Sequence, residues 1–432
     1  MLLSTTLLAD TAQRLRSAQL DLFEYINALC DRIETHEPDI KALIPEEQRR
    51  ERLLREALLL QAQYPDPATR PPLYGITVGV KDIFHVNGFP TKAGSLLPEE
   101  LFEGPEASCV SRLKQAGALI AGKTVTTEFA YFEPGPTRNP HNPKHTPGGS
   151  SSGSAAGVAS GFFPLSFGTQ TIGSVIRPAA FCGIVGFKPT FNRIPTDGLL
   201  IFSKSADHVG LFTQDIEGME LAASLLCRQW RPVRACHILP VLGVPEGRYL
   251  VQATDLALIA FENQIALLEQ AGYCVKRIAM FEDIDVINAR HRLMTAAEAA
   301  QEHEAWFQAH HKLYRPRTAE VILKGRKVSP EQLWEARQGC AQLRHYLSEQ
   351  RCHYGVDIWI SPAATGEAPI GLEATGDPIM NLPWTHAGLP VITVPAGFTK
   401  NRLPLGLQCA ADVYQDEKLL FWMHRVAEVL KY

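Results

Sequence analysis

One stretch of the chain, residues 146–190, constrains the possible folds more than any other. It reads TPGGSSSGSAAGVASGFFPLSFGTQTIGSVIRPAAFCGIVGFKPT and holds two segments rich in glycine, serine and threonine, residues 148–153 and 168–174. Glycines beside serines allow backbone N–H groups to converge on one point, because no Cβ blocks the approach. Converging donors beside a hydroxyl are the components of an oxyanion hole with a nucleophile.

Composition alone also fits a flexible glycine/serine linker for the first segment. The neighbouring residues argue against a linker. Residues 154–161 are small and predict a short helix, and the apolar runs 162–167 and 184–187 predict buried strands. The stretch is therefore expected to lie inside an α/β core, with the glycines at turns.

A lysine inside an apolar run adds a second chemical group. Residues 73–84, LYGITVGVKDIF, predict a strand with Lys81 near its end. Lysines are almost always solvated, whereas burial among apolar neighbours would lower the pKa of this amine toward about 7–8. Residues 107–117 predict a helix and 118–123 a strand, the repeating unit of an α/β sheet.

These segments together resemble the amidase signature family. The matching motifs are G-G-S-S-S-G-S-A-A from Gly148, G-T-Q-T-I-G-S from Gly168, then R-P-A, F-C-G and G-F-K-P-T, with Lys81 in G-x-x-x-x-V-K-D upstream. The resemblance implies an α/β fold with a large central mixed β-sheet covered by helices on both faces. It also implies one large domain over residues 64–432. Residues 1–63, whose apolar periodicity predicts two or three helices, would form a helical arm packed on that domain.

The resemblance further implies an amidohydrolase that turns a linear carboxamide into a carboxylate and ammonia or an amine. Ser174 would be the nucleophile and Lys81 the base. Ser150, entered through a cis peptide bond, would relay the proton between them. The oxyanion hole would come from Thr171, Ile172 and Gly173, although isoleucine stands here where the family usually has glycine or alanine.

The substrate is expected to meet Arg177, Gly149 and Tyr131. Arg177 lies three residues after Ser174, and with Gln170 in place of the usual aspartate this resembles the malonamidase branch. Arg177 would then grip the carboxylate of a small half-amide with parallel hydrogen bonds. The alternatives are that Arg177 only braces its loop, or that Tyr131, Phe132 and Trp384 form an apolar pocket.

Three other functions compete with this interpretation. The resemblance also covers the amidase component of the aminoacyl-tRNA amidotransferases, which acts inside a complex with partner proteins. An α/β-hydrolase would use Ser151 in G-x-S-x-G with His386 or His424, but prolines before the motif argue against the required strand. A phosphate-binding loop lacks the necessary G-K-[ST].

The remaining sequence mainly excludes function classes. The 432 residues carry a net charge of −4 without a basic stripe, so no nucleic acid or membrane partner is expected. The nine cysteines are scattered and include no CxxC pair, which predicts neither disulfides nor zinc and suits a cytoplasmic protein. Residues 296–309, with His303 and His310, predict a surface helix rather than a metal site. No metal or cofactor is expected, the partner is a small amide substrate, and a homodimer is one option.

Overall fold

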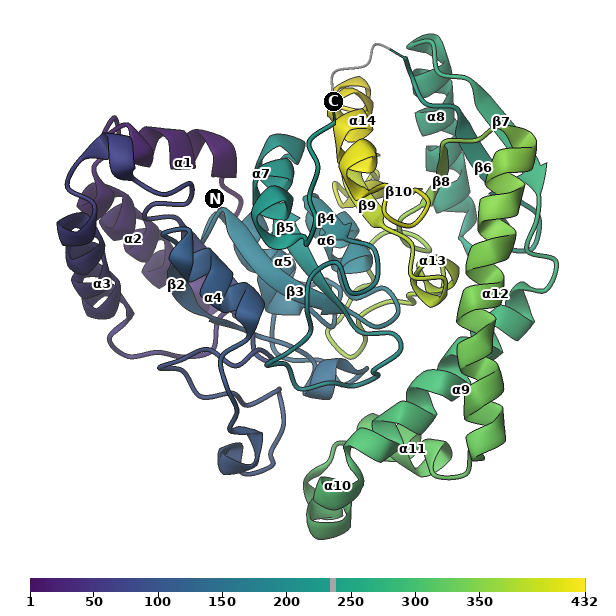
Figure 1. Cartoon of the computed structure of the whole chain (residues 1–432), viewed down its shortest axis with the longest axis horizontal. Coiled ribbons are helices and arrows are strands. Elements are labelled where there is room, and N and C mark those ends of the chain that lie inside the picture. The colour runs from purple at the N-terminus through teal and green to yellow at the C-terminus, as the bar shows by residue number, and fades with distance from the viewer. Residues whose placement is uncertain (234–237, 432) are drawn as a thin grey trace.

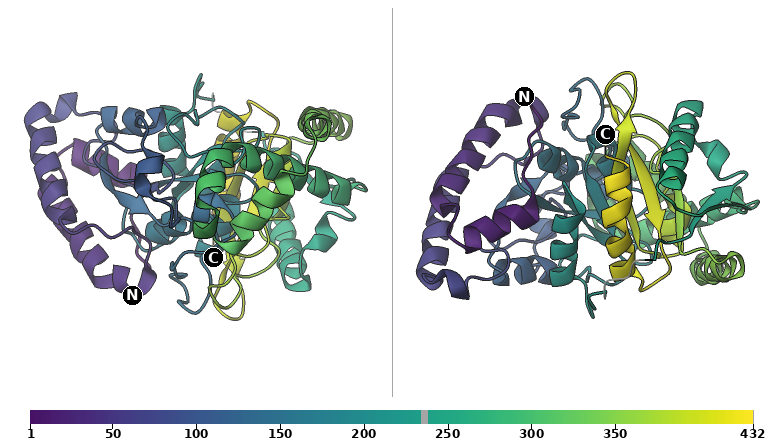
Figure 2. Two further views of the ribbon diagram at one scale, coloured as in Figure 1. Left: turned by 90° about the horizontal axis from the view of Figure 1, so that it is seen from below. Right: turned by 90° about the horizontal axis from the view of Figure 1, so that it is seen from above.

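The computed structural model describes residues 1–233 and 238–431, and the ribbon is shown in Figures 1 and 2. Among these residues, fourteen α-helices and ten strands form an α/β protein. The strands are β1 Thr77–Lys81, β2 Leu119–Thr124, β3 Leu165–Gln170, β4 Val185–Lys188, β5 His208–Thr213, β6 Leu242–Glu246, β7 Val275–Ala279, β8 Ile358–Pro362, β9 Val391–Phe398 and β10 Pro404–Ala410. The helices are α1 Leu8–Arg16, α2 Leu22–Ile40, α3 Arg49–Gln63, α4 Ser108–Gln115, α5 Ser152–Ala159, α6 Ile176–Cys182, α7 Ile216–Leu226, α8 Asp255–Gln270, α9 Ile284–Glu302, α10 Glu304–His310, α11 Pro316–Gly325, α12 Pro330–Tyr354, α13 Leu382–His386 and α14 Asp416–Val429.

All ten strands join one mixed sheet in the order β2-β1-β3-β5-β4-β9-β10-β8-β6-β7. The outer strands pair in parallel, with β1 between β2 and β3 and β6 between β7 and β8. The central strands from β3 to β8 pair antiparallel. Strands β1, β2 and β3 are buried along their whole length, as expected for a sheet covered on both faces.

Helices cover both faces of this sheet. On one face α7 and α14 pack on each other and reach β5 and β9, while on the other α5 and α6 pack on each other and reach β3 and β4 (Figure 1). Helix α5 is made of serine, glycine, alanine and valine, and every residue in it is buried. Small side chains permit this close packing: a Cβ on Gly153 would lie 2.5 Å from Val125 N. The predicted α/β/α arrangement is confirmed.

The three N-terminal helices lie at the β2 end of the sheet (Figure 1). Helix α2 begins after Asp21, whose carboxylate accepts hydrogen bonds from the N–H groups of Phe23 and Glu24. The segment after α2 pairs with β2 through an isolated bridge between Leu43 and Thr124. Tyr25 on α2 also bonds Thr77 on β1, with 2.7 Å between the oxygens.

Two local predictions are corrected by the structure. The strand expected at 162–167 is β3, shifted to Leu165–Gln170, so that residues 168–170 of the second glycine segment belong to the sheet. Gly168 pairs with Gly210 of β5 and lies against the Phe212 ring, where a side chain would collide. The periodicity of a short apolar run cannot reveal this pairing.

The helix expected at residues 296–309 is not a surface helix. It is divided between α9 and α10, and α9 is covered by α11 and α12 (Figure 1). Glu298 is buried and accepts hydrogen bonds from Ser203 and Ser205, besides an ion pair with Arg337. An alanine- and glutamate-rich pattern is typical of exposed helices, but this glutamate has buried partners from distant segments.

Two further sequence expectations concern membrane-spanning helices and cysteines. No helix within the described ranges is long and apolar enough to cross a bilayer. Five of the described cysteines are buried, whereas Cys274 and Cys352 are exposed and Cys236 lies outside the described residues.

Candidate active site

Lys81 and Ser150 lie in contact at the centre of the predicted site. Lys81 ends β1 and is fully buried, and its Nζ is 2.7 Å from Ser150 Oγ and 2.7 Å from Thr169 Oγ1 on β3. Ser150 lies in the loop before α5, and the Gly149–Ser150 peptide bond is cis, as the resemblance implied. Parallel pairing of β1 with β3 places the lysine and Thr169 at the same edge of the sheet.

Burial sets the ionisation of this lysine. Desolvation lowers the pKa of Lys81 from 10.5 to about 7, and the nearby negative charge of Asp207 partly opposes that shift. Asp207 is itself buried, accepts from the Thr171 hydroxyl at 2.5 Å, and accepts from the N–H groups of Phe202 and Ser203. In a large fraction of the protein molecules the Lys81 amine is therefore neutral near pH 7, as a general base requires.

A tight turn, residues 171–174, connects β3 to α6 and contains the predicted oxyanion hole. Among the described hydrogen bonds, the N–H groups of Ile172, Gly173 and Ser174 have no acceptor. Ile172 does not have a positive φ, so a β-branched residue fits the turn without strain. Gly173 is needed because a Cβ there would come within 2.8 Å of Pro378 and collide with Asn381.

Ser174 ends this turn at the entrance to α6. It is 8% exposed, more than Lys81 at 0% or Ser150 at 2%. In the described part of the chain, its Oγ has no hydrogen-bond partner within 3.5 Å. Of the three predicted catalytic residues, the hydrogen bonds of the described chain join Lys81 to Ser150 and leave Ser174 unjoined to either, with its hydroxyl the most exposed of the three.

Arg177, on the first turn of α6, is enclosed by protein and is only 1% exposed. Its Nη2 donates to the Gly149 carbonyl at 2.7 Å and to Thr375 Oγ1 at 3.1 Å. Its Nε and Nη1 have no partner among the described atoms. Desolvation lowers the Arg177 pKa to about 10, with the negative charge of Asp377 opposing this. Arg177 therefore braces the loop that carries Gly149 and still keeps free donors.

A cavity of about 460 Å³ adjoins the turn. Tyr131 and Phe132 form part of its wall together with Ile172, and the Tyr131 ring stacks on Phe202. Charged groups are present as well, and the complete lining is Tyr131, Phe132, Ile172, Arg292, Thr295, Ala296, Val321, Lys324, Gly376, Asp377, Pro378, Ile379 and Leu382. This cavity can hold an organic group of a substrate whose carbonyl lies at the turn.

Trp384 does not belong to that wall. It is 1% exposed, packs edge-on against Tyr249 and Phe281, and donates from Nε1 to the Tyr249 hydroxyl at 2.8 Å. The aromatic pocket proposed from sequence thus keeps Tyr131 and Phe132 and loses Trp384, which is part of the core. Sequence spacing could not separate a core tryptophan from a pocket tryptophan.

The residues of the α/β-hydrolase alternative lie in unsuitable places. Ser151 is fully buried, and its Oγ accepts from the Thr169 N–H at 3.2 Å. His386 contacts His291 and Cys340, and His424 is ion-paired with Glu220 on α7. Burial lowers the His386 pKa to about 2. Neither histidine is hydrogen-bonded to Ser151, so the described residues do not form a serine–histidine pair there.

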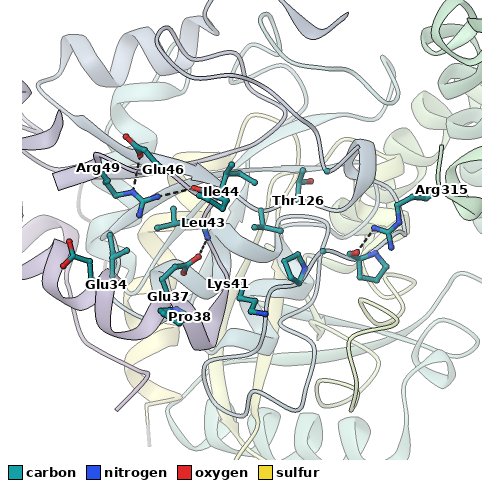
Figure 3. Close-up of a pocket in the computed structure, with 17 residues that line it drawn as sticks. Glu34, Glu37, Pro38, Lys41, Leu43, Ile44, Glu46, Arg49, Thr126 and Arg315 are labelled. Atoms are coloured by element: carbon teal, nitrogen blue, oxygen red, sulfur yellow. Dashed lines mark hydrogen bonds and ion pairs between the residues drawn. The ribbon is translucent and has the colours of Figure 1, made fainter. Parts of the chain in front are cut away.

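A second cavity, of about 770 Å³, lies between the N-terminal helices and the main body (Figure 3). Glu37 on its wall accepts from the N–H groups of Ala42 and Leu43, and burial raises the Glu37 pKa to about 7. On the opposite side Arg315 donates to the Pro134 carbonyl at 2.7 Å. No predicted catalytic residue and no residue of the 171–174 turn lines this cavity, whereas Ile172 of the turn lines the first one, so the second cavity is separate from the candidate site.

Sequence reasoning missed two residues at the site, Thr169 and Asp207. Thr169 was visible inside the second glycine segment, one residue before Gln170. Asp207 gave no local signal, because β5 brings its neighbourhood beside β3 only through antiparallel pairing. In the described residues, no cluster of three or more histidine, cysteine, aspartate or glutamate side chains is arranged to hold a metal ion.

Comparison with known proteins assigns the fold and chemistry to a family. The family described as Amidase matches residues 24–420. The A subunit of the Thermus thermophilus glutamyl-tRNA(Gln) amidotransferase is 30% identical over 458 residues, covering 94% of this chain and 93% of the relative. Its counterpart from Oleidesulfovibrio alaskensis is 29% identical over 472 residues, covering 96% of each. A crystal structure of an amidase superimposes with a TM-score of 0.89 at 28% identity, covering 99% of this chain and 100% of that one.

The family match spans most of the chain, and the structural match spans nearly all of it. The motifs at residues 75–82, 148–156 and 168–190 lie within the matched range. The chain therefore belongs to the amidase signature family and is an amide-hydrolysing enzyme that acts on carbon–nitrogen bonds.

Proposed function

We propose that this enzyme acts alone on a small linear carboxamide through an acyl-enzyme on Ser174, with Ser150 and Lys81 transferring the proton. The observation that carries the proposal is the 2.7 Å contact between Lys81 Nζ and Ser150 Oγ in a fully buried setting. A protonated lysine on the surface would be a poor base. A buried lysine with a pKa of about 7 is suited to accept a proton from a hydroxyl.

The first half-reaction forms the acyl-enzyme. Ser174 Oγ attacks the amide carbon as its proton passes to Ser150 Oγ, and the Ser150 proton passes to neutral Lys81. The carbonyl oxygen becomes an oxyanion, which the N–H groups of the 171–174 turn stabilise. Collapse of this intermediate breaks the C–N bond, and Ser150 returns a proton to the leaving nitrogen while Lys81 restores the Ser150 proton.

Water completes the cycle by the same proton route. It attacks the acyl carbon and gives a proton through Ser150 to Lys81. When the ester bond to Ser174 breaks, Lys81 returns this proton through Ser150 to the Ser174 oxygen. The products are a carboxylic acid and a free Ser174 hydroxyl. No step in this cycle needs a histidine or a metal ion to move a proton.

The substrate class we favour is a half-amide of a short dicarboxylic acid. The free Nε and Nη1 donors of Arg177 support an anionic group nearby, because a buried cation with unpaired donors is costly. The alternative is a neutral amide whose organic group occupies the cavity beside Tyr131 and Phe132. Both substrates place their carbonyl at the same turn.

The test is a screen of purified protein for ammonia release from primary amides, half-amides and acyl-amides, followed by substitution of the three residues. Ser174→Ala should abolish turnover, by at least about 10⁴-fold, because it removes the nucleophile. Lys81→Ala should lose about 10²- to 10⁴-fold in kcat, as loss of a general base does, and Ser150→Ala somewhat less. Turnover of Ser174→Ala at the wild-type rate would refute the mechanism.

A second function is favoured by the curated relatives. The two relatives described above are components of glutamyl-tRNA(Gln) amidotransferases, and their alignments cover nearly all of this chain. A partner-dependent role predicts that other proteins copurify and that the isolated chain releases ammonia only when they are added. Turnover by the isolated chain, without partners, supports the stand-alone amidase instead.

A further inference from the structure

Two carbonyl groups of the 171–174 turn accept hydrogen bonds from residues that lie far away in the sequence. His291 on α9 donates from Nε2 to the Thr171 carbonyl at 3.0 Å. Thr385 on α13 donates from Oγ1 to the Ile172 carbonyl at 2.7 Å. Helices α9 and α13 pack on each other, so both anchors come from neighbouring helices (Figure 1).

Peptide geometry converts these anchors into an orientation of donors. In a trans peptide unit the C=O of one residue and the N–H of the next lie in one plane and point in opposite directions. The Thr171 carbonyl shares its peptide unit with the Ile172 N–H, and the Ile172 carbonyl shares its unit with the Gly173 N–H. Fixing both carbonyls toward α9 and α13 therefore turns both N–H groups away from these helices, and neither has another acceptor among the described residues.

Each anchor has a polar residue behind it that fixes its direction. Gln170 Nε2 donates to Thr385 Oγ1 at 2.9 Å, so the Thr385 proton is directed to a carbonyl: Ile172 O is the nearer at 2.7 Å and Asn381 O the farther at 3.2 Å. The same glutamine accepts from the N–H groups of Val175 and Ile176 through Oε1. An aspartate, the residue usual at this position, has no N–H to give Thr385.

The histidine is fixed in the same way. Because a carbonyl only accepts, His291 Nε2 must carry a proton, so Nδ1 of the neutral ring is an acceptor. His386 Nδ1 lies 3.1 Å from that atom and is its donor. Both rings are buried, at 0% and 2% exposure, and burial lowers both of their pKa values.

We propose that His291 and Thr385, with Gln170 behind Thr385, are positioning residues that aim the Ile172 and Gly173 N–H groups at the substrate oxygen. They do not touch the substrate and transfer no proton. This inference rests on the proposed function, since it assumes that Ser174 is the nucleophile beside the turn. It gives histidine a role that the sequence did not predict.

The chain offers two matched pairs of variants. Thr385→Val keeps the size of the side chain and removes the hydroxyl, whereas Thr385→Ser keeps the hydroxyl. His291→Leu removes the donor, whereas His291→Gln supplies an amide N–H at a similar distance. Loss of one oxyanion donor costs about 10²- to 10³-fold, and a misaimed donor should cost about 10- to 100-fold.

The readout is the rate at which a fluorophosphonate probe modifies Ser174, followed by mass spectrometry, together with kcat and KM on an amide from the screen. The probe needs no knowledge of the natural substrate and develops charge on an oxygen at the same place. Thr385→Val and His291→Leu should lower the labelling rate and kcat about 10- to 100-fold with KM nearly unchanged. Thr385→Ser and His291→Gln should recover most of the rate.

Two failures can be told apart. Wild-type protein that is not labelled at Ser174 would overturn the proposed function, and this inference with it. Wild-type labelling at Ser174, with the same rate in Thr385→Val, would overturn the positioning role alone. If Thr385→Val or His291→Leu does not fold, Gln170→Glu tests the same chain of bonds. A glutamate there would accept a hydrogen bond from Thr385 Oγ1, which would then no longer donate to the Ile172 carbonyl. Normal kcat in that variant would therefore also overturn the proposal.

Discussion

At the scale of single residues, the pKa of Lys81 links structure to chemistry. The neutral amine is the proposed base, so activity should rise with pH through about 7. The negative charge of Asp207 raises the pKa of Lys81, and the Asp207 carboxylate accepts a hydrogen bond from the Thr171 hydroxyl. The pH at which activity rises therefore depends on the charge of the buried Asp207 carboxylate.

We predict that Asp207→Asn shifts the rising limb of kcat/KM to lower pH, because removal of the negative charge disfavours the ammonium form of Lys81. Asparagine can still accept from the N–H groups of Phe202 and Ser203, so the loop should keep its shape. The measurement is a pH profile from about pH 5 to about pH 9 for both proteins, a range that brackets the limb. A limb that moves to higher pH would contradict the assignment of that limb to Lys81.

Lys81 also has a predictable effect on stability. Its folded pKa of about 7 lies below its unfolded value of 10.5. Between these values the unfolded chain binds more protons, so the free energy of unfolding rises with pH. One pKa unit corresponds to about 1.4 kcal/mol, so the charged lysine costs the fold about 5 kcal/mol well below pH 7 and about 4 kcal/mol at pH 7.

We predict that Lys81→Met is more stable than wild type at pH 7 by about 2–3 kcal/mol, after allowing about 1–2 kcal/mol for the lost contacts with Ser150 and Thr169. The advantage should shrink as the pH approaches about 10. Urea unfolding at pH 7 and at about pH 9.5 measures both values. A difference between the two proteins that does not change with pH would rule out this account of the buried lysine.

At the scale of elements, the structure explains which parts of the site the sequence could predict. The Lys81 strand, the Ser150 loop and the Ser174 turn each belong to a continuous motif, and each was expected where it lies. Asp207, His291 and Thr385 reach the site through β5, α9 and α13, whose positions depend on sheet pairing and helix packing over the whole chain. Local patterns of polarity carry no information on such contacts.

The same reasoning applies to the fold. The helical character of residues 1–63, helices α4 and α5, and strands β1, β2 and β4 could be predicted from periodicity and turn residues. The shifted start of β3 could not be predicted because it depends on antiparallel pairing with β5. The burial of α9 could not be predicted because it depends on packing against α11 and α12. The family resemblance predicted a large mixed sheet, but neither its strand order nor its division into parallel edges and an antiparallel centre.

Arg177 connects two loops, and its role decides the substrate class. It bonds the Gly149 carbonyl before Ser150 and the Thr375 hydroxyl before Asp377. If its free donors bind a substrate carboxylate, Arg177→Leu should raise KM for half-amides at least about tenfold more than for neutral amides of equal length. An equal increase in KM for both substrate sets, or a preference of the wild-type enzyme for neutral amides, would show that Arg177 only braces the loops.

At the scale of the whole molecule, the N-terminal helices are coupled to the catalytic edge of the sheet. The segment after α2 pairs with the end of β2: Ile44 N–H donates to Lys123 O and Val125 N–H donates to Ala42 O, both at 2.8 Å. Two residues further on, the Thr127 N–H donates to the Ser150 carbonyl. The boundary at residue 63, the oligomeric state and the cytoplasmic location stay predictions.

This coupling predicts that residues 64–432 do not fold without residues 1–63. Strand β2 is at the edge of the sheet, and removal of the arm would expose its backbone together with the apolar face under Tyr25 and Leu22. Full-length protein should unfold in one cooperative transition by calorimetry, and Tyr25→Phe, which removes the bond to Thr77, should lower stability by about 1 kcal/mol without splitting it. The truncated chain should be insoluble or lack a transition. A soluble 64–432 fragment with the full-length melting temperature would show instead that the arm is an independent addition to the enzyme.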